Sequence, residues 1–181
     1  QGLKYLSDKN IIISTEHGPM GGDEININKL QDVKIKNFGW PISSYGEHYA
    51  EFITCESKGF KEKKFTMFKI ISFANYDECE VSKLKKSHKK NGFVEPIKYY
   101  VPSIGISEII ELFVSGKKIE NSFILTSLRA ASIYFIEFND DFSKINYEET
   151  FEINERIRDI IYLKNKNSYL MLLEDSPSIA T

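Results

Sequence analysis

The segment Glu16–Asn26 combines residue types that could bind a metal ion. It contains Gly18-Pro19, which predicts an irregular turn whose backbone carbonyls can point outward, and a glycine pair at 21 and 22, which allows close backbone approach. Asp23 and Glu24 then add carboxylate oxygens. Carbonyls together with carboxylates are ligands that Ca²⁺ prefers, although the spacing is not that of an EF-hand. An Asp/Glu-capped loop without metal is the alternative interpretation.

A second group of residues could recognise a carboxylate. Arg156 and Arg158 have the spacing i, i+2, so on a strand their side chains point the same way. Two planar guanidinium groups on one face suit carboxylate recognition. The alternative is a solvated charged face, because Glu152 and Glu155 lie close by in the sequence.

These residues are separated by short apolar runs rich in Ile, Phe and Tyr, bounded by clusters of Gly, Asn, Asp, Ser and Lys. Such runs predict strands and an all-β fold. The one helix candidate is the short, Lys-rich segment Asp77–Lys90, which we interpret as an insertion between strands. The expected strands are Leu3–Leu6, Ile11–Ser14, Ile25–Leu30, Thr66–Phe73, Ile109–Val114, Ser122–Leu128, Ser132–Phe138, Glu149–Ile153, Arg158–Leu163 and Ser168–Leu173.

An internal repeat predicts how the strands are arranged. The segment 2–14 aligns with 159–171, matching Tyr5 to Tyr162 and Asn10 to Asn167, and a third copy begins at Glu108, 51 residues before the second. A period of about 50 residues with several strands in each period is typical of β-propeller blades. Four strands are expected between Ser107 and Ile153, which makes one blade. A β-sandwich would also have many short strands, but without this spacing.

The length implies an incomplete ring. A propeller closes with roughly four to eight blades, whereas residues 1–181 provide about three to four. Both ends fall inside blade-like units. We therefore expect the chain to be a partial β-propeller domain, the C-terminal part of a longer one.

Composition excludes several classes of protein. The net charge of −2, from 24 basic and 26 acidic residues, argues against nucleic-acid binding. A hydrophobic content of 41% and a mean hydropathy of −0.32 argue against disorder, and no apolar run approaches the ~20 residues of a spanning helix. Cys55 and Cys79 are too few for a four-cysteine zinc site, and could be bridged or free.

Two motifs carry a resemblance to a known family. Residues 16–26, followed by Asn37-Phe-Gly-Trp-Pro41, resemble E-H-G-P-x-G-G-D-E-[IV]-N and N-Y-G-W-P of the soluble quinoprotein glucose/sorbosone (aldose sugar) dehydrogenases. Further matches extend the resemblance over nearly the whole chain: Val101-Pro-Ser103, Ser127-Leu-Arg129, Arg156-Ile-Arg-Asp159 and Leu172-Leu-Glu-Asp175. The resemblance implies a six-bladed β-propeller, of which this chain would supply roughly the C-terminal half.

The resemblance also implies an activity and two cofactors. Family members bind pyrroloquinoline quinone (PQQ) and Ca²⁺, and they oxidise the C1 hydroxyl of aldose sugars to lactones by hydride transfer to the quinone, which passes electrons to an external acceptor. The histidine that acts as the base is expected upstream of Gln1, so residues 1–181 alone are expected to be inactive. A periplasmic or secreted location follows from the family habit alone. The sugar and the oligomeric state stay open.

The matched positions imply roles for individual residues. The PQQ carboxylates would be bound by Ser103, Arg129, Arg156 and Arg158. The carbonyls of Gly18 and Pro19 would hold the Ca²⁺ that bridges PQQ, while Glu24 and the Phe38 carbonyl would bind a second, structural Ca²⁺. Trp40 is expected to be a packed hydrophobic anchor. We expect His48 and His88 to be surface or loop histidines.

Departures from the family pattern leave a second function open. The segment Gly105-Ile-Ser107 replaces A-P-S, and Glu174 replaces a threonine, which adds negative charge near an anion site. A catalytically silent propeller that binds carbohydrate or protein is therefore the alternative.

Overall fold

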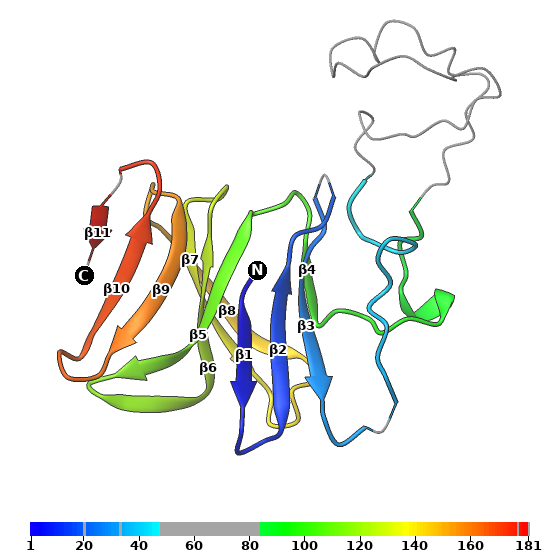
Figure 1. The fold of residues 1–181 in the computed structure, drawn as a ribbon, viewed down its shortest axis with the longest axis horizontal. Coiled ribbons are helices and arrows are strands. Elements are labelled where there is room, and N and C mark those ends of the chain that lie inside the picture. Colours follow the sequence, from blue (N-terminus) through cyan, green and yellow to red (C-terminus); the bar gives the residue numbers. More distant parts are fainter. Residues whose placement is uncertain (20, 33, 48–83, 177, 181) are drawn as a thin grey trace, which may run out of the picture.

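The computed structural model describes residues 1–19, 21–32, 34–47, 84–176 and 178–180. Its strands form three antiparallel sheets of four, four and three strands, and consecutive strands are neighbours in each sheet. The sheets stand side by side and follow one another along the chain (Figure 1). The expected all-β class is therefore confirmed for the described residues.

Nine of the strands correspond to predicted apolar runs, whereas Lys98–Tyr100 and Ser178–Ala180 were not predicted. The first sheet contains β1 (Leu3–Leu6), β2 (Ile11–Glu16), β3 (Asp23–Lys29) and β4 (Lys98–Tyr100). The second contains β5 (Ile106–Val114), β6 (Lys117–Ser127), β7 (Ser132–Phe138) and β8 (Ile145–Glu152). The third contains β9 (Ile157–Leu163), β10 (Ser168–Leu173) and β11 (Ser178–Ala180). The four strands expected between Ser107 and Ile153 thus form a single sheet, as predicted.

Some expectations differ from the structure or lie outside it. The runs that became β6 and β8 were predicted too short. The first half of β6 is mostly polar and exposed, whereas β8 begins with the alternating Ile145 and Tyr147, which the prediction missed. The described end of the helix candidate Asp77–Lys90 holds only the start of a three-residue 3₁₀ helix, Lys89–Asn91. The expected strand Thr66–Phe73, both cysteines and His48 lie outside the described residues.

The internal repeat corresponds to one hairpin used twice. Tyr5 donates a hydrogen bond to Asn10 Oδ1 at 3.2 Å, and Tyr162 donates to Asn167 Oδ1 at 2.8 Å. Both asparagines have positive φ, 53° and 49°, a conformation that asparagine tolerates better than most residues. The repeated Tyr and Asn therefore mark the same turn between β1 and β2 and between β9 and β10.

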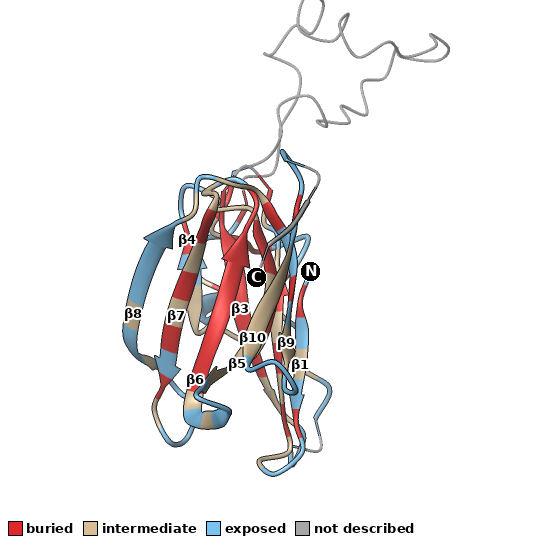
Figure 2. Cartoon of the chain, turned by 90° about the vertical axis from the view of Figure 1, so that its left-hand side faces the viewer, coloured by how far each residue is buried: buried red, intermediate tan, exposed pale blue. Residues whose placement is uncertain are grey.

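The hydrophobic core lies between the first and second sheets. Its largest fully buried side chains include Phe123, Phe138 and Phe142, whose rings contact one another. Ile13 and Ile25 of the first sheet belong to the same cluster. Burial falls toward the outer strand, since β6 is largely buried and β8 largely exposed (Figure 2).

A buried polar network joins one strand of each sheet. Thr15 of β2 donates to the Ser107 carbonyl at 2.7 Å, and the Ser107 hydroxyl donates to the Ile157 carbonyl at 2.7 Å. The Ser107 hydroxyl also lies 2.8 Å from the hydroxyl of Thr126. Hydroxyl groups therefore hold β2, β5 and β9 together where their backbones do not pair.

The substitution Ser107→Ala is expected to lower the free energy of unfolding by about 2 kcal/mol, because it leaves the buried Ile157 carbonyl without its donor. Urea unfolding measures this change. Ser143→Ala is the matched control, since Ser143 is exposed and the change should stay within about 0.5 kcal/mol. Equal midpoints for both variants would contradict this role for Ser107.

Candidate functional site

The turns that carry the predicted site residues all lie at one end of the sheets. They connect β2 to β3, β4 to β5, β6 to β7 and β8 to β9, and Figure 1 shows these connections along the same edge. Backbone hydrogen bonds link each turn to the next: Gly22 N–H to the Tyr100 carbonyl, Leu128 N–H to the Gly105 carbonyl and Asn154 N–H to the Ala131 carbonyl. The predicted residues therefore stand on one continuous rim.

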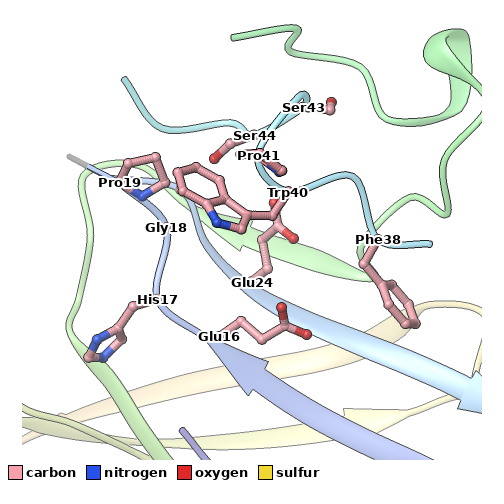
Figure 3. A pocket seen from close by; sticks show the side chains of 11 residues that line it. Glu16, His17, Gly18, Pro19, Glu24, Phe38, Trp40, Pro41, Ser43 and Ser44 are labelled. Atoms are coloured by element: carbon pink, nitrogen blue, oxygen red, sulfur yellow. The ribbon is translucent and has the colours of Figure 1, made fainter. Parts of the chain in front are cut away.

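A cavity of about 650 Å³ opens at the start of this rim. All four predicted metal-binding residues line it. Trp40 also lines it and is 61% exposed, so the expectation of a packed anchor was wrong: its indole borders the cavity and is not in the core (Figure 3). The lining residues are Glu16, His17, Gly18, Pro19, Gly22, Glu24, Phe38, Trp40, Pro41, Ser43 and Ser44.

The Gly18-Pro19 turn has the properties expected of a cation site built from carbonyls. A Cβ at Gly18 would collide with the carbonyls of Gly21 and Gly22, so the turn needs glycine there. Among the described residues, neither the Gly18 nor the Pro19 carbonyl accepts a hydrogen bond. Neither oxygen is thus satisfied by a described donor, as a ligand role requires, although the Pro19 oxygen packs against Gly46, where an added Cβ would collide with it.

Asp23 holds this turn in place. Its buried carboxylate accepts hydrogen bonds from Gly18 N–H at 3.2 Å and Ile106 N–H at 3.0 Å. The Ser103 hydroxyl lies 2.8 and 2.7 Å from its two oxygens. The position of Asp23 in the motif suggested a metal ligand, but its oxygens bind protein donors.

Ser103 was predicted to bind a cofactor carboxylate. Its hydroxyl instead donates to Asp23 and accepts from Gly105 N–H at 3.1 Å. The structure therefore gives Ser103 a role in closing the turn between β4 and β5, and quinone binding by this hydroxyl would require it to leave Asp23.

Glu24 and the Phe38 carbonyl face a histidine. His88 Nδ1 lies 2.9 Å from the Phe38 carbonyl oxygen, and His88 Nε2 lies 3.1 Å from Glu24 Oε1 without the alignment of a hydrogen bond. His88 is 1% exposed. It is a loop residue, but the expectation that it could be a surface histidine was wrong, because Tyr45 and Gly39 pack around its ring.

Burial shifts the pKa of both Glu24 and His88. It raises the pKa of Glu24 to about 7, an effect that the hydrogen bond from Asn26 opposes and the charge of Glu16 reinforces. Burial lowers the pKa of His88, against the effect of its bond to the Phe38 carbonyl. The Asn26 amide also donates to Glu16, so one amide bridges the two carboxylates.

The two predicted arginines converge on one carboxylate. Arg156 Nε lies 2.9 Å from Glu174 Oε2, and Arg158 donates from a terminal nitrogen to Glu174 Oε1 at 2.6 Å. Arg156 Nε is also 3.6 Å from Asp175. The prediction that both side chains point the same way is confirmed. Their hydrogen bonds, first that of Arg158 and then that of Arg156, lower the pKa of Glu174.

Arg129 lies on the rim but not in the first cavity. It lines a separate cavity of about 520 Å³ with Ser103, Tyr134 and Glu148. Arg156 and Arg158 line neither of these two cavities. The structure therefore brings the predicted residues to one edge in three groups: the metal residues, the pair Ser103 and Arg129, and the arginine pair.

Side-chain ligands for a metal are few. Within the described ranges, no three His, Cys, Asp or Glu side chains are placed to hold an ion, so a cation here would depend on backbone carbonyls. In the part of the chain that the structure covers, no helix is long and apolar enough to cross a membrane.

The chain is an all-β protein of consecutive antiparallel sheets, and the turns that carry the predicted site residues lie at one end of these sheets. Comparison with known proteins identifies the family. The Glucose / Sorbosone dehydrogenase family matches residues 1–72 and 68–180. Aldose sugar dehydrogenase YliI of Escherichia coli (strain K12) is 44% identical over 59 residues, which cover 33% of this chain and 15% of that protein. The chain therefore belongs to the glucose/sorbosone dehydrogenase family.

Solved structures show the same fold. The apo-form of the soluble aldose sugar dehydrogenase from Escherichia coli superposes with a TM-score of 0.62 at 23% identity, covering 99% of this chain and 42% of that structure. A glucose dehydrogenase structure has a TM-score of 0.62 at 24% identity, with the same two coverages. The chain thus spans less than half the length of these relatives.

Proposed function

We propose that the complete protein is a PQQ- and Ca²⁺-dependent dehydrogenase that oxidises the C1 hydroxyl of aldose sugars to lactones. Family membership supports a sugar oxidoreductase in general. The observation that carries the more specific proposal is that Arg156 and Arg158 both bind one carboxylate at the rim, that of Glu174. A site that orders two guanidinium groups around one carboxylate suits a cofactor with several carboxylates.

The residues of this chain would divide the work of binding. Arg156 and Arg158 would bind quinone carboxylates, and Arg129 would add positive charge farther along the rim. The free carbonyls of Gly18 and Pro19 would hold Ca²⁺. When bound, the quinone would accept the hydride and the ion would polarise the quinone carbonyl as a Lewis acid. No histidine of the described residues is proposed as the base.

The test is reconstitution of the full-length protein with PQQ and Ca²⁺, followed by reduction of an acceptor dye with a panel of aldoses. We expect reduction that requires the sugar, the quinone and Ca²⁺ together. The matched control is the same protein without quinone. If no sugar of the panel reduces the dye, the proposal is contradicted.

One observation favours the alternative of a catalytically silent binding module. Glu174 already occupies the arginine pair, and under this alternative the pair serves the fold and not a cofactor. If so, equilibrium dialysis would detect no PQQ uptake, while sugar or protein binding to the rim would survive. The same dialysis therefore separates the two functions.

A further inference from the structure

His88 is enclosed on several sides. The Tyr45 ring stacks on its imidazole at 5.3 Å between centroids and 17° between planes. Tyr45 in turn stacks on Tyr99 and donates a hydrogen bond to Glu95. These contacts fix the ring in one orientation with almost no exposure to solvent.

The two ring nitrogens are aimed at two particular oxygens. The Phe38 carbonyl can only accept a hydrogen bond, so His88 Nδ1 must carry the proton that spans their 2.9 Å separation. Nε2 on the other side of the ring lies 3.1 Å from Glu24 Oε1. The imidazole therefore stands between the carboxylate of β3 and the carbonyl of the 37–41 loop, and it is hydrogen-bonded to the carbonyl.

The same two oxygens are those that the family resemblance assigns to a second, structural Ca²⁺. A calcium ion would need both within about 2.3–2.6 Å, but the imidazole ring lies between them. The two arrangements exclude each other. The residues that the structure places here do not fit the ion.

The loop sequence accommodates the ring. Gly39 has φ of 97°, and a Cβ at this position would come 2.8 Å from His88 Nδ1. Glycine therefore meets two needs at once, a left-handed backbone and space for the imidazole. The 3₁₀ helix that follows His88 ends at Gly92 (φ 83°), and Phe93 N–H returns to the His88 carbonyl at 3.0 Å.

From these contacts we infer that His88 takes the place of the second Ca²⁺, so that an imidazole and not a metal ion fills the space between the Glu24 carboxylate and the Phe38 carbonyl. Through its hydrogen bond to the Phe38 carbonyl, the ring holds the 37–41 loop, which borders the main cavity, beside the start of β3. It is part of the folded protein and needs no ion.

The experiment measures thermal unfolding of the full-length protein with Ca²⁺ and with a chelator, and Tb³⁺ luminescence as a direct probe of ion binding. No quinone or sugar is present, so the result does not depend on the proposed activity. Because the Gly18 and Pro19 carbonyls are proposed to hold a separate Ca²⁺, we expect any difference in melting temperature between the two conditions to be the same for the wild-type protein and for Glu24→Gln. Any Tb³⁺ signal should be unchanged by Glu24→Gln.

The variant His88→Ala removes the ring and exposes the two oxygens to an ion. We expect a lower melting temperature that Ca²⁺ raises by about 4 °C or more, and the double variant with Glu24→Gln should lose this response. His17→Ala is the matched control: His17 lines the same cavity but points away from Glu24 (Figure 3), so its response to Ca²⁺ should equal that of the wild-type protein.

Two results would overturn the inference. The first is wild-type protein that melts lower in chelator, or binds Tb³⁺, in a way that Glu24→Gln abolishes, because an ion would then occupy the position. The second is a folded His88→Ala variant whose response to Ca²⁺ equals that of the wild-type protein. If His88→Ala does not fold, the comparison of wild type with Glu24→Gln still decides the question.

Discussion

The substitution Asp23→Asn is expected to lower the free energy of unfolding by about 3 kcal/mol, the largest stability effect of any single change at the rim. The Asp23 carboxylate is fully buried and accepts from three donors: Gly18 N–H, Ile106 N–H and the Ser103 hydroxyl. An amide replaces one accepting oxygen by a donor, so one N–H of the protein faces another. Urea unfolding of the full-length protein measures the loss.

Two further variants separate the stability lost with the buried hydrogen bonds from the stability lost with the negative charge. Ser103→Ala removes one donor and leaves the other two, so its effect should be smaller, about 1 kcal/mol. Asp140→Asn makes the same chemical change at an exposed carboxylate that accepts a hydrogen bond from Asn121 at 3.3 Å, and it should stay within about 0.5 kcal/mol. An Asp23→Asn variant as stable as Asp140→Asn would show that the hydrogen bonds to the Asp23 carboxylate contribute little to stability.

Local sequence predicted most of the fold because the strands and hairpins depend on neighbouring residues. The repeated Tyr and Asn encode a turn in which the hydroxyl and the amide are five residues apart. The segment Ser132–Phe138 alternates inward and outward side chains along its length. Such patterns can be read from a window of about ten residues.

The contacts that decide the site are long-range, and sequence alone did not predict them. His88 meets Phe38 and Glu24 across 50 and 64 residues of chain, and no local signal marks a lysine-rich loop as the source of a buried imidazole. The prediction that Trp40 is packed was wrong for a related reason, because the burial of its side chain depends on whether the loop faces the core or the cavity. The Gly18-Pro19 turn of the family motif borders a cavity, but the neighbours of that turn came only from the structure.

The role of Glu174 was predicted from the sequence in part. Its replacement of threonine in the family pattern indicated negative charge near an anion site, and the structure makes the relation specific: one carboxylate oxygen for each arginine. The ion pairs are largely exposed, so they contribute little to stability. Their consequence lies in competition for the arginines.

Replacing both arginines by glutamine, Arg156→Gln with Arg158→Gln, is expected to weaken PQQ binding to the full-length protein by about 100-fold or more. Each guanidinium lost removes a charge-assisted hydrogen bond worth about 1.5–3 kcal/mol, and 1.4 kcal/mol is a factor of ten in Kd. Glu174→Gln should act in the opposite direction, strengthening PQQ binding about tenfold, because the two guanidinium groups lose the internal carboxylate that they share.

Equilibrium dialysis with PQQ at constant Ca²⁺ measures both effects without requiring turnover. Lys164→Gln, which neutralises an exposed cation just after β9, controls for a general loss of positive charge and should leave Kd within a factor of two or so. The two opposite shifts identify competition, since an arginine pair that merely supports the fold would not bind quinone more tightly when Glu174 is neutralised. Weaker PQQ binding by Glu174→Gln would instead show that this carboxylate orients the arginines for the cofactor.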